Sequence, residues 1–354
     1  MQRQQQITDW LSGLYPQQEF SLAPASADAS FRRYFRATFA DGSTKVVMDA
    51  PPQHEDCKPF LHVGRLFEAA GVHVPHVYAQ DLELGFLLLS DLGNTTYLQA
   101  LDADSASRLY GAATNTLIKL QLSSKANKLP PYDEALLRRE LNLFPEWYIA
   151  KHLGVTLSEK QKAKLEDVFK RILSNNLAQP CVYVHRDFHS RNLMVSEPPH
   201  PNSLPGVEEA NEKENFLISP GVLDFQDAVY GPITYDLASL FKDAYIKWEE
   251  AEIIDWLIRY WEKARKAGLP VRADFGEFYR DYELVGAQRH IKVLGIFARL
   301  YHRDGKSGYL KDMPRVMEYL HKACERYIDL KPLLNILLEL NAQIQQANKE
   351  GAAS

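Results

Sequence analysis

Two segments in the middle of the sequence have the residue types and spacing that phosphoryl transfer requires. The first is segment 185–192, HRDFHSRN, which matches the pattern H-R-D-x-x-x-x-N. Its Asp187 could accept the proton of an attacking hydroxyl group, and its Asn192 could coordinate a metal ion on the same phosphate. The alternative is a loop in which both side chains merely cap turns. We take Asp187 as the candidate catalytic base and Asn192 as a candidate metal ligand.

The second segment is 221–227, GVLDFQD, in which Asp224 directly follows an apolar run. In kinase chemistry such an aspartate holds the Mg²⁺ that bridges the β- and γ-phosphates and offsets the charge developing during transfer. Taken alone, an aspartate after a strand is better explained as a turn residue. The two segments together, in this order, favour a magnesium-dependent kinase with Asp224 as the second metal ligand.

Length and composition limit the class of protein. The chain has 354 residues, 45% of them hydrophobic and 25% charged, which is enough for two lobes with separate cores. Its net charge of −5 provides no extended cationic surface for nucleic acid. The three cysteines fit neither a disulfide framework nor a metal-ligand spacing, and no apolar run approaches the roughly 20 residues that span a bilayer. We expect a cytoplasmic monomer whose partners are small molecules, not nucleic acid or a membrane.

Short β-rich runs dominate the first part of the chain. Alternating apolar residues and turn signals predict strands and one helix, at 34–39, 44–48, 77–80 and 86–89 for the strands and 58–70 for the helix. We expect these elements to form a small antiparallel sheet with one helix. This is the predicted nucleotide-binding lobe, residues 1–90.

Helical periodicity dominates the rest of the chain. It predicts helices at 252–267, 275–302, 313–328 and 333–348, with strand-like stretches only at 182–185 and 216–225. Segment 197–214, rich in Pro, Asn and Glu and without an apolar period, indicates a mobile loop. The predicted fold class is therefore α+β and bilobal, with a larger, mainly helical catalytic and substrate-binding lobe of residues 91–354.

With both acidic segments in place, the sequence resembles the aminoglycoside phosphotransferase and choline kinase superfamily, relatives of protein kinases that phosphorylate small molecules. The resemblance extends over nearly the whole chain. It implies the protein-kinase-like fold, ATP and Mg²⁺ as cofactors, and the roles already given to Asp187, Asn192 and Asp224. Segment 235–238, YDLA, looks like the family's D-L-A segment, which implies that Asp236 braces the catalytic loop.

The segment where a phosphate-binding loop is expected, 26–35, contains no glycine. Small residues would still let the backbone approach the phosphates, and nearby arginines could add charge. The alternative is an ordinary turn with solvated arginines. Residues after strand 86–89 resemble the hinge between lobes, where backbone groups bind adenine. The candidate nucleotide-binding residues are Ser26, Ala29, Ser30, Arg32, Arg33, Ser90 and Asp91.

The third predicted strand departs from the family pattern. Family members carry a lysine there that grips the α- and β-phosphates, but Met48 stands at that position, and Lys45 lies on the opposite side of the pleat. Either an arginine of the preceding loop supplies the cation or nucleotide binding is unusual. Glu68 on the following helix would then lack its customary lysine partner.

Three further segments, 28–36, 48–52 and 288–295, are similar to a narrower branch, the anomeric N-acetylmuramate/N-acetylglucosamine kinases of bacterial cell-wall recycling. The similarity implies phosphorylation of the C1 hydroxyl of an amino sugar to a sugar 1-phosphate. Arg289 and Lys292 are three residues apart on one helical face and could meet a lactyl carboxylate, or could equally be solvated charges. The candidate sugar-binding residues are Glu140, Asp227, Tyr230, Arg289 and His290.

Two alternatives stay open at this point. One is a kinase for another small alcohol, such as an aminoglycoside, choline or homoserine. The other is a catalytically inactive nucleotide-binding regulator, which Met48 and the glycine-free loop would fit. The intact base and metal ligands argue against the regulator, since an inactive protein has no evident need for them.

Overall fold

The computed structural model describes residues 2–27, 31–196 and 219–352, and these form two compact units. The first contains Met1–Leu120 with Arg191–Asp227, and the second contains Gln121–Ser190 with Ala228–Ser354. The first unit thus extends beyond the predicted lobe of residues 1–90. The loop expected at 197–214 lies outside the described residues.

A five-stranded antiparallel sheet forms the centre of the first unit, with strand order β1-β2-β3-β5-β4. Its strands are β1 (Phe20–Ala27), β2 (Arg33–Phe39), β3 (Thr44–Asp49), β4 (Val77–Asp81) and β5 (Phe86–Ser90). The four predicted strands of this region are confirmed. β1 was not expected.

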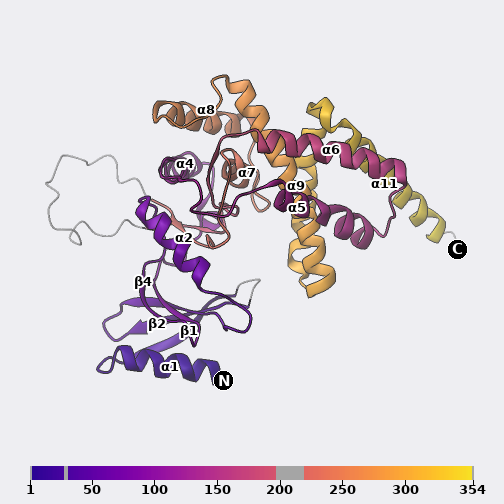
Figure 1. Cartoon of the computed structure of the whole chain (residues 1–354). Helices are drawn as coiled ribbons and strands as arrows, with labels where there is room; N and C mark the ends of the chain where they lie inside the picture. The colour runs from indigo at the N-terminus through magenta and orange to yellow at the C-terminus, as the bar shows by residue number, and fades with distance from the viewer. Residues whose placement is uncertain (1, 28–30, 197–218, 353–354) are drawn as a thin grey trace. The chain divides into compact units, whose positions relative to one another are not determined.

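The two faces of this sheet differ because side chains alternate along each strand. On one face, Phe35, Val47 and Leu88 form a core with Ile7 and Leu11, which lie four residues apart on α1 (Gln2–Leu14). Figure 1 shows α1 along this side of the sheet. The prediction of a single helix in this region was wrong, because the glutamine-rich start of the chain hides the short apolar face of α1.

The opposite face of the sheet is turned toward α2 (Lys58–Ala69), which matches the predicted helix closely (Figure 1). Phe60 and Phe67 of α2 pack on the ring of Phe225, at centroid distances of 4.7 and 5.8 Å. A Cβ added at Gly64 would lie 3.4 Å from that ring, so glycine permits the close approach. Apolar packing therefore joins α2 to the segment that carries Asp224.

Shorter elements complete the first unit. They are α3 (Tyr97–Ala100), α4 (Ala106–Leu122), whose last two residues belong to the second unit, and the antiparallel pair β7 (Leu193–Met194) and β8 (Gly221–Val222). Within the described part of the strand expected at 216–225, only β8 forms a strand. This pairing brings Asn192, which precedes β7, next to Leu223, which follows β8.

The second unit is mainly helical, as predicted. Its elements are α5 (Glu134–Leu143), a π-helical segment (Phe144–His152), α6 (Glu159–Leu177), α7 (Tyr235–Phe241), α8 (Glu250–Lys266), α9 (Phe275–Asp304), α10 (Met313–Arg326) and α11 (Lys331–Ala352), with the strand pair β6 (Cys181–Val184) and β9 (Val229–Pro232). The four predicted C-terminal helices are confirmed within a few residues. The predicted strand at 182–185 corresponds to β6.

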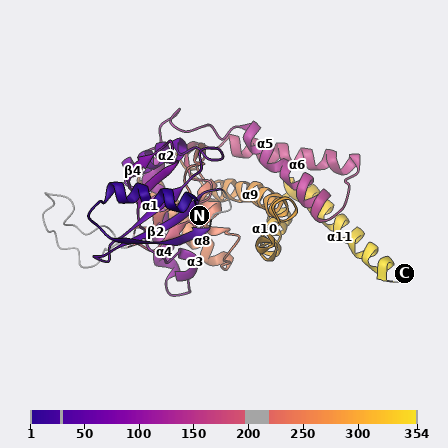
Figure 2. The ribbon, with the colours of Figure 1, turned by 90° about the horizontal axis from the view of Figure 1, so that it is seen from below.

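Helix α9 is the central element of the second unit, with 30 residues and contacts to α5, α6, α7 and α10. Figure 2 shows it flanked by α5 and α10. Asp274 caps its first turn by accepting a hydrogen bond from the Glu277 amide, and Gly305 ends it with a φ of 68°. Because α9 is surrounded, several of its polar residues are buried, Arg289 and Lys292 among them, and buried charges need partners.

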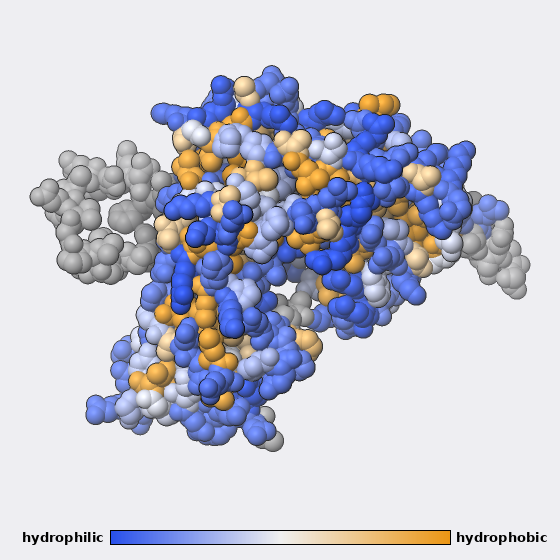
Figure 3. All heavy atoms as spheres, in the orientation of Figure 1, coloured by the Kyte–Doolittle hydropathy of each residue, from blue (hydrophilic) through white to orange (hydrophobic). Residues whose placement is uncertain are grey.

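No described helix is long and apolar enough to cross a bilayer. Large apolar side chains with substantial exposure are scattered along the chain, from Leu14 and Phe31 to Ile328 and Leu338. On the face shown in Figure 3, hydrophilic atoms interrupt the hydrophobic ones. Such scattered residues are ordinary on a protein surface.

Candidate active site

The loop that follows β6 holds Asp187 and is clamped by one carboxylate. Asp236, at the start of α7, accepts hydrogen bonds from the backbone amides of His185 at 2.7 Å and Arg186 at 3.0 Å. Arg186 has a φ of 77°, a left-handed conformation that costs a non-glycine residue about 1–3 kcal/mol. Asp236 thus braces the loop, the role that the resemblance to the D-L-A segment implied. Burial raises the pKa of Asp236 to about 7, against the opposing effect of these hydrogen bonds.

Asp187 lies beside cations of α9. Arg289 Nη1 is 3.6 Å from Asp187 Oδ1 and donates a hydrogen bond of 2.7 Å to the carbonyl oxygen of Arg186. Removal from water would raise the pKa of Asp187, but the charges of Lys292 and Arg289 hold it well below its usual range. The lowered pKa favours the ionised carboxylate, and the side chain keeps 40% of its surface exposed, so it is accessible to an acceptor.

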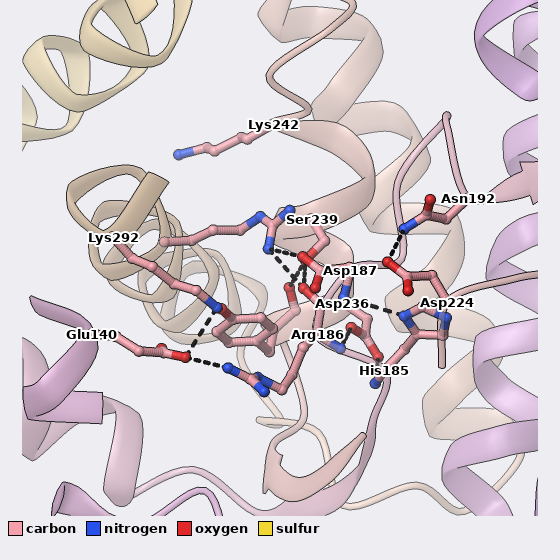
Figure 4. A network of polar contacts seen from close by, with 12 residues as sticks. Glu140, His185, Arg186, Asp187, Asn192, Asp224, Asp236, Ser239, Lys242 and Lys292 are labelled. Atoms are coloured by element: carbon pink, nitrogen blue, oxygen red, sulfur yellow. Dashed lines mark hydrogen bonds and ion pairs between the residues drawn. The ribbon is translucent and has the colours of Figure 1, made fainter. Parts of the chain in front are cut away.

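Glu140 of α5 is the anionic centre of a buried network (Figure 4). Its Oε1 atom binds Arg186 Nη2 at 2.5 Å and Lys292 Nζ at 3.1 Å, while Oε2 accepts hydrogen bonds from Tyr132 at 2.5 Å and Gln288 at 3.1 Å. Burial would raise the pKa of Glu140, but Lys292 and Arg186 lower it. Both carboxylate oxygens are thus engaged within the protein, which makes Glu140 a support for Arg186 more than a free sugar ligand.

The remaining predicted sugar-binding residues lie in different surroundings. His290 stacks on Tyr319 at 5.2 Å, with Nε2 3.4 Å from the Lys242 carbonyl oxygen, so it belongs to the packing of α9 against α10 and not to the network around Asp187. Tyr230 is half-buried in β9, and Asp227 is exposed. The alternative of a solvated charged face for Arg289 and Lys292 was wrong, because these side chains belong to residues only 6% and 5% exposed.

The two predicted metal ligands lie together in the first unit. Asn192 Nδ2 is 3.4 Å from Asp224 Oδ2 (Figure 4). Gln226 Nε2 donates to Asp224 Oδ1 at 2.8 Å. The amide of Leu223 donates to the Asn192 carbonyl oxygen at 2.9 Å, which fixes the two chain segments. Asp224 has a φ of 61°, so it too is held in a strained conformation of the kind found at functional sites.

This donor set fits a hard divalent cation. Carboxylate and amide oxygens are the ligands that Mg²⁺ accepts, usually only one or two from protein, with the others supplied by phosphates and water. Across the described ranges, no group of three or more His, Cys, Asp or Glu could hold a metal by itself. A small set completed by phosphate oxygens matches that preference.

A cavity of about 580 Å³ in the first unit is large enough for a nucleotide. Asn192, Asp224 and Arg191 line one part of it, and Ser90 and Asp91 line another. The sheet contributes Tyr34, Arg36, Val46 and Leu89, all from the face opposite α1, and α2 contributes Phe60. The predicted hinge residues and metal ligands therefore surround one cavity.

The predicted arginines of the phosphate loop do not line this cavity. Arg33 binds Asp49 Oδ2 at 2.5 Å on the α1 side of the sheet, where Arg3 binds the other oxygen, and Arg32 Nε lies 3.8 Å from Glu55. Ala29 and Ser30 are outside the described residues. For Ser26 the structure gives only its backbone pairing with Tyr34 in the sheet.

The interpretation of the third strand agrees with the structure. Met48 is fully buried on the same face as Val46, whereas Lys45 points away and lies 3.8 Å from the centre of the Tyr78 ring. Glu68 pairs with His76 at 2.9 Å. Within the described residues, Glu68 therefore pairs with a histidine and not with a lysine of β3.

Sequence reasoning missed Arg36 and Arg191, the two cations that line the cavity in the described residues. Arg36 of β2 pairs with Val46 of β3, so both side chains point to the same face of the sheet. The alternation of side chains along the predicted strand could have indicated that Arg36 is on the cavity face. Arg191 lies inside the recognised motif, where the pattern leaves its position open.

Comparisons with known proteins show the family and the fold of the chain. The sequence matches the phosphotransferase enzyme family over residues 21–207 and 213–275. An N-acetylmuramate/N-acetylglucosamine kinase of Neisseria meningitidis serogroup B is 49% identical over 344 residues, 96% of each chain. One of Pseudomonas putida is 47% identical over 350 residues, 96% of this chain and 97% of the relative. The solved structure of amicoumacin kinase hAmiN with AMP-PNP, Ca²⁺ and Ami has a TM-score of 0.59 at 14% identity, covering 88% of this chain and 92% of that one. These likenesses confirm the predicted kinase-like α+β fold.

Proposed function

Because the chain belongs to the phosphotransferase enzyme family, we propose that it transfers the γ-phosphate of ATP to the C1 hydroxyl of N-acetylmuramate or N-acetylglucosamine. The observation that carries the proposal is that Asp187 is exposed and ionised within a loop that Asp236 holds next to the strained residue Arg186. We infer the acceptor sugar from the names of relatives that are nearly half identical to this chain. We infer the reaction from the motif at 185–192.

Asp187 would orient the acceptor hydroxyl and take its proton as the bond to phosphorus forms. A carboxylate with a lowered pKa is a weak base for a neutral alcohol, so proton transfer would come late, when the hydroxyl has become acidic. Arg289 would keep the carboxylate ionised and in place until then.

Asn192 and Asp224 would hold magnesium, which supplies positive charge to the phosphates when bound. The adenine would occupy the part of the cavity next to Ser90 and Asp91, where backbone groups of the hinge can form hydrogen bonds. Four residues separate Asp187 from Asn192 in the sequence, so the base and a metal ligand belong to one short loop.

Two ion pairs of the second unit limit how the acceptor sugar can bind. Lys292 and Arg289 already face Glu140 and Asp187, so a lactyl carboxylate of N-acetylmuramate would compete with these pairs. Tyr230 and Asp227 remain the proposed hydrogen-bonding partners of the sugar. A sugar without a carboxylate would not face this competition, so we predict that neutral N-acetylglucosamine is accepted as well.

A coupled ADP-release assay with ATP and magnesium tests the proposal. The acceptors are the two amino sugars, choline, homoserine and kanamycin, and phosphorus NMR identifies the phosphorylated position. We expect a sugar 1-phosphate. Turnover of another alcohol alone would replace the acceptor, and phosphate on another sugar hydroxyl would replace the regiochemistry, while the phosphotransferase assignment would stand.

A further inference from the structure

We propose that Arg191 binds the nucleotide phosphates and supplies the positive charge that β3 does not provide. The inference rests on the proposed use of ATP and concerns the cavity of the first unit. Its starting point is the charge of the cavity wall. In the described part of that wall, Asp91 and Asp224 are the carboxylates and Arg36 and Arg191 are the cations.

The sheet side of the cavity offers no cation where a phosphate chain would pass. Met48 is fully buried, and α2 directs Phe60, Gly64 and Phe67 at the Phe225 ring. This packing is apolar. A triphosphate carries several negative charges, so binding it next to the carboxylate of Asp224 requires a cation as well as a metal ion.

Arg36 is at the wrong part of the cavity for that role. Its guanidinium forms a fork with Asp91, at 2.5 Å from Nε and 2.9 Å from Nη2, and also donates to the Gly93 carbonyl oxygen at 3.2 Å. Both oxygens of Asp91 are used, so this charge is matched locally. Arg36 therefore joins β2 to the hinge segment, where a nucleoside would lie.

Arg191 lies at the other part, next to Asn192 in the chain, and lines the cavity together with Asn192 and Asp224. The backbone there is fixed by the pairing of Leu193 with Val222 and by the hydrogen bond from Leu223 to the Asn192 carbonyl oxygen. A guanidinium is planar and binds phosphate oxygens in pairs, which suits it to this position. The metal ligands and the phosphate-binding cation would thus come from residues next to the β7–β8 pair.

Nucleotide affinities measured by calorimetry test the role of Arg191 without relying on turnover. The ligands are adenosine, ADP and AMP-PNP, each titrated without magnesium so that the metal does not mask the side chain. For Arg191→Gln we expect about tenfold or weaker binding of ADP and AMP-PNP, the loss of one charged contact, with adenosine affinity unchanged. Arg191→Lys should retain most of the phosphate-dependent affinity.

Arg36→Gln is the matched control, since it removes the other cavity arginine. It should weaken adenosine and ADP by the same factor, because its contacts lie at the hinge. Equal AMP-PNP affinity of wild type and Arg191→Gln, or an equal loss for adenosine, would overturn the inference. Failure of folded wild-type protein to bind any of the nucleotides would instead contradict the proposed function.

Discussion

Arg289 Nη1 lies 3.6 Å from the Asp187 carboxylate and 2.7 Å from the Arg186 carbonyl oxygen, so one guanidinium contacts both the proposed base and the strained peptide before it. The loop is also held by Asp236, which accepts two backbone hydrogen bonds. The position of Asp187 is therefore fixed by the hydrogen bonds of Asp236 on α7 and by the guanidinium of Arg289 on α9.

Removing the Arg289 charge should change the pH dependence of catalysis. Removal from water opposes ionisation of Asp187, and Lys292 and Arg289 overcome it, so Arg289→Gln should raise the Asp187 pKa. We expect kcat of the variant to fall as the pH approaches the ordinary carboxylate pKa of about 4, while the wild type holds its rate. Arg280→Gln is the control, because Arg280 is on the same helix and pairs with Asp329 at the surface. Identical pH profiles of wild type and Arg289→Gln would refute this role.

The same lowered pKa has a consequence for stability. A carboxylate with a depressed folded-state pKa stabilises the fold above its unfolded pKa and loses that contribution as the pH falls. Arg289→Gln should therefore lose less stability than the wild type on acidification below about pH 4. Urea unfolding at several pH values measures the difference.

Asp236→Asn tests the clamp. An amide can accept only through its one oxygen, so one of the two backbone amides is left unpaired, at a cost of about 1–3 kcal/mol. The raised pKa of about 7 gives the sign of the pH effect. Between about pH 4 and that value the wild-type group is protonated only when folded, so wild-type stability falls relative to Asp236→Asn as the pH rises. A stability difference that stays constant with pH would show that Asp236 is ionised throughout.

Glu140→Gln should destabilise the second unit strongly. It leaves Arg186 and Lys292 without their shared carboxylate in a buried site, and breaking such a pair costs about 3–5 kcal/mol. Asp255→Asn is the matched control, because its pair with Arg259 is exposed and worth less than about 1 kcal/mol. Chemical denaturation of both variants measures the contrast, and similar small losses would contradict the network.

Asp224→Ala should abolish the magnesium-dependent part of nucleotide affinity. Loss of the carboxylate leaves Asn192 as the remaining predicted ligand, whereas binding without magnesium should stay equal or improve because a negative charge is gone. Calorimetry with AMP-PNP, with and without magnesium, separates the two effects. Asp227→Asn, three residues away and outside the cavity wall, should keep the magnesium dependence. Unchanged magnesium dependence in Asp224→Ala would refute the metal assignment.

The sequence predicted the elements that have a clear apolar period and the motifs that have a fixed spacing. Strands β2 to β5 and helices α8 to α11 belong to the first group, and Asp187, Asn192 and Asp224 to the second. Helix α1 escaped detection because only Ile7 and Leu11 mark its buried face.

Pairings between residues that are far apart in the chain could not be predicted from the sequence. Arg36 and Asp91 are 55 positions apart, and nothing in either segment names the other as its partner. The burial of Arg289 and Lys292 was equally hidden, since charged residues on a helix usually face solvent. These two side chains face Asp187 and Glu140 because neighbouring helices surround α9.

Phosphorylation by wild type and by Asp187→Asn, followed by phosphorus NMR with N-acetylglucosamine and N-acetylmuramate, tests the central claim most directly. We predict a sugar 1-phosphate from the wild type, a rate lowered about 10²- to 10⁴-fold in Asp187→Asn, and equal ATP affinity in both proteins. A variant that forms the 1-phosphate at the wild-type rate would show that Asp187 is not the base.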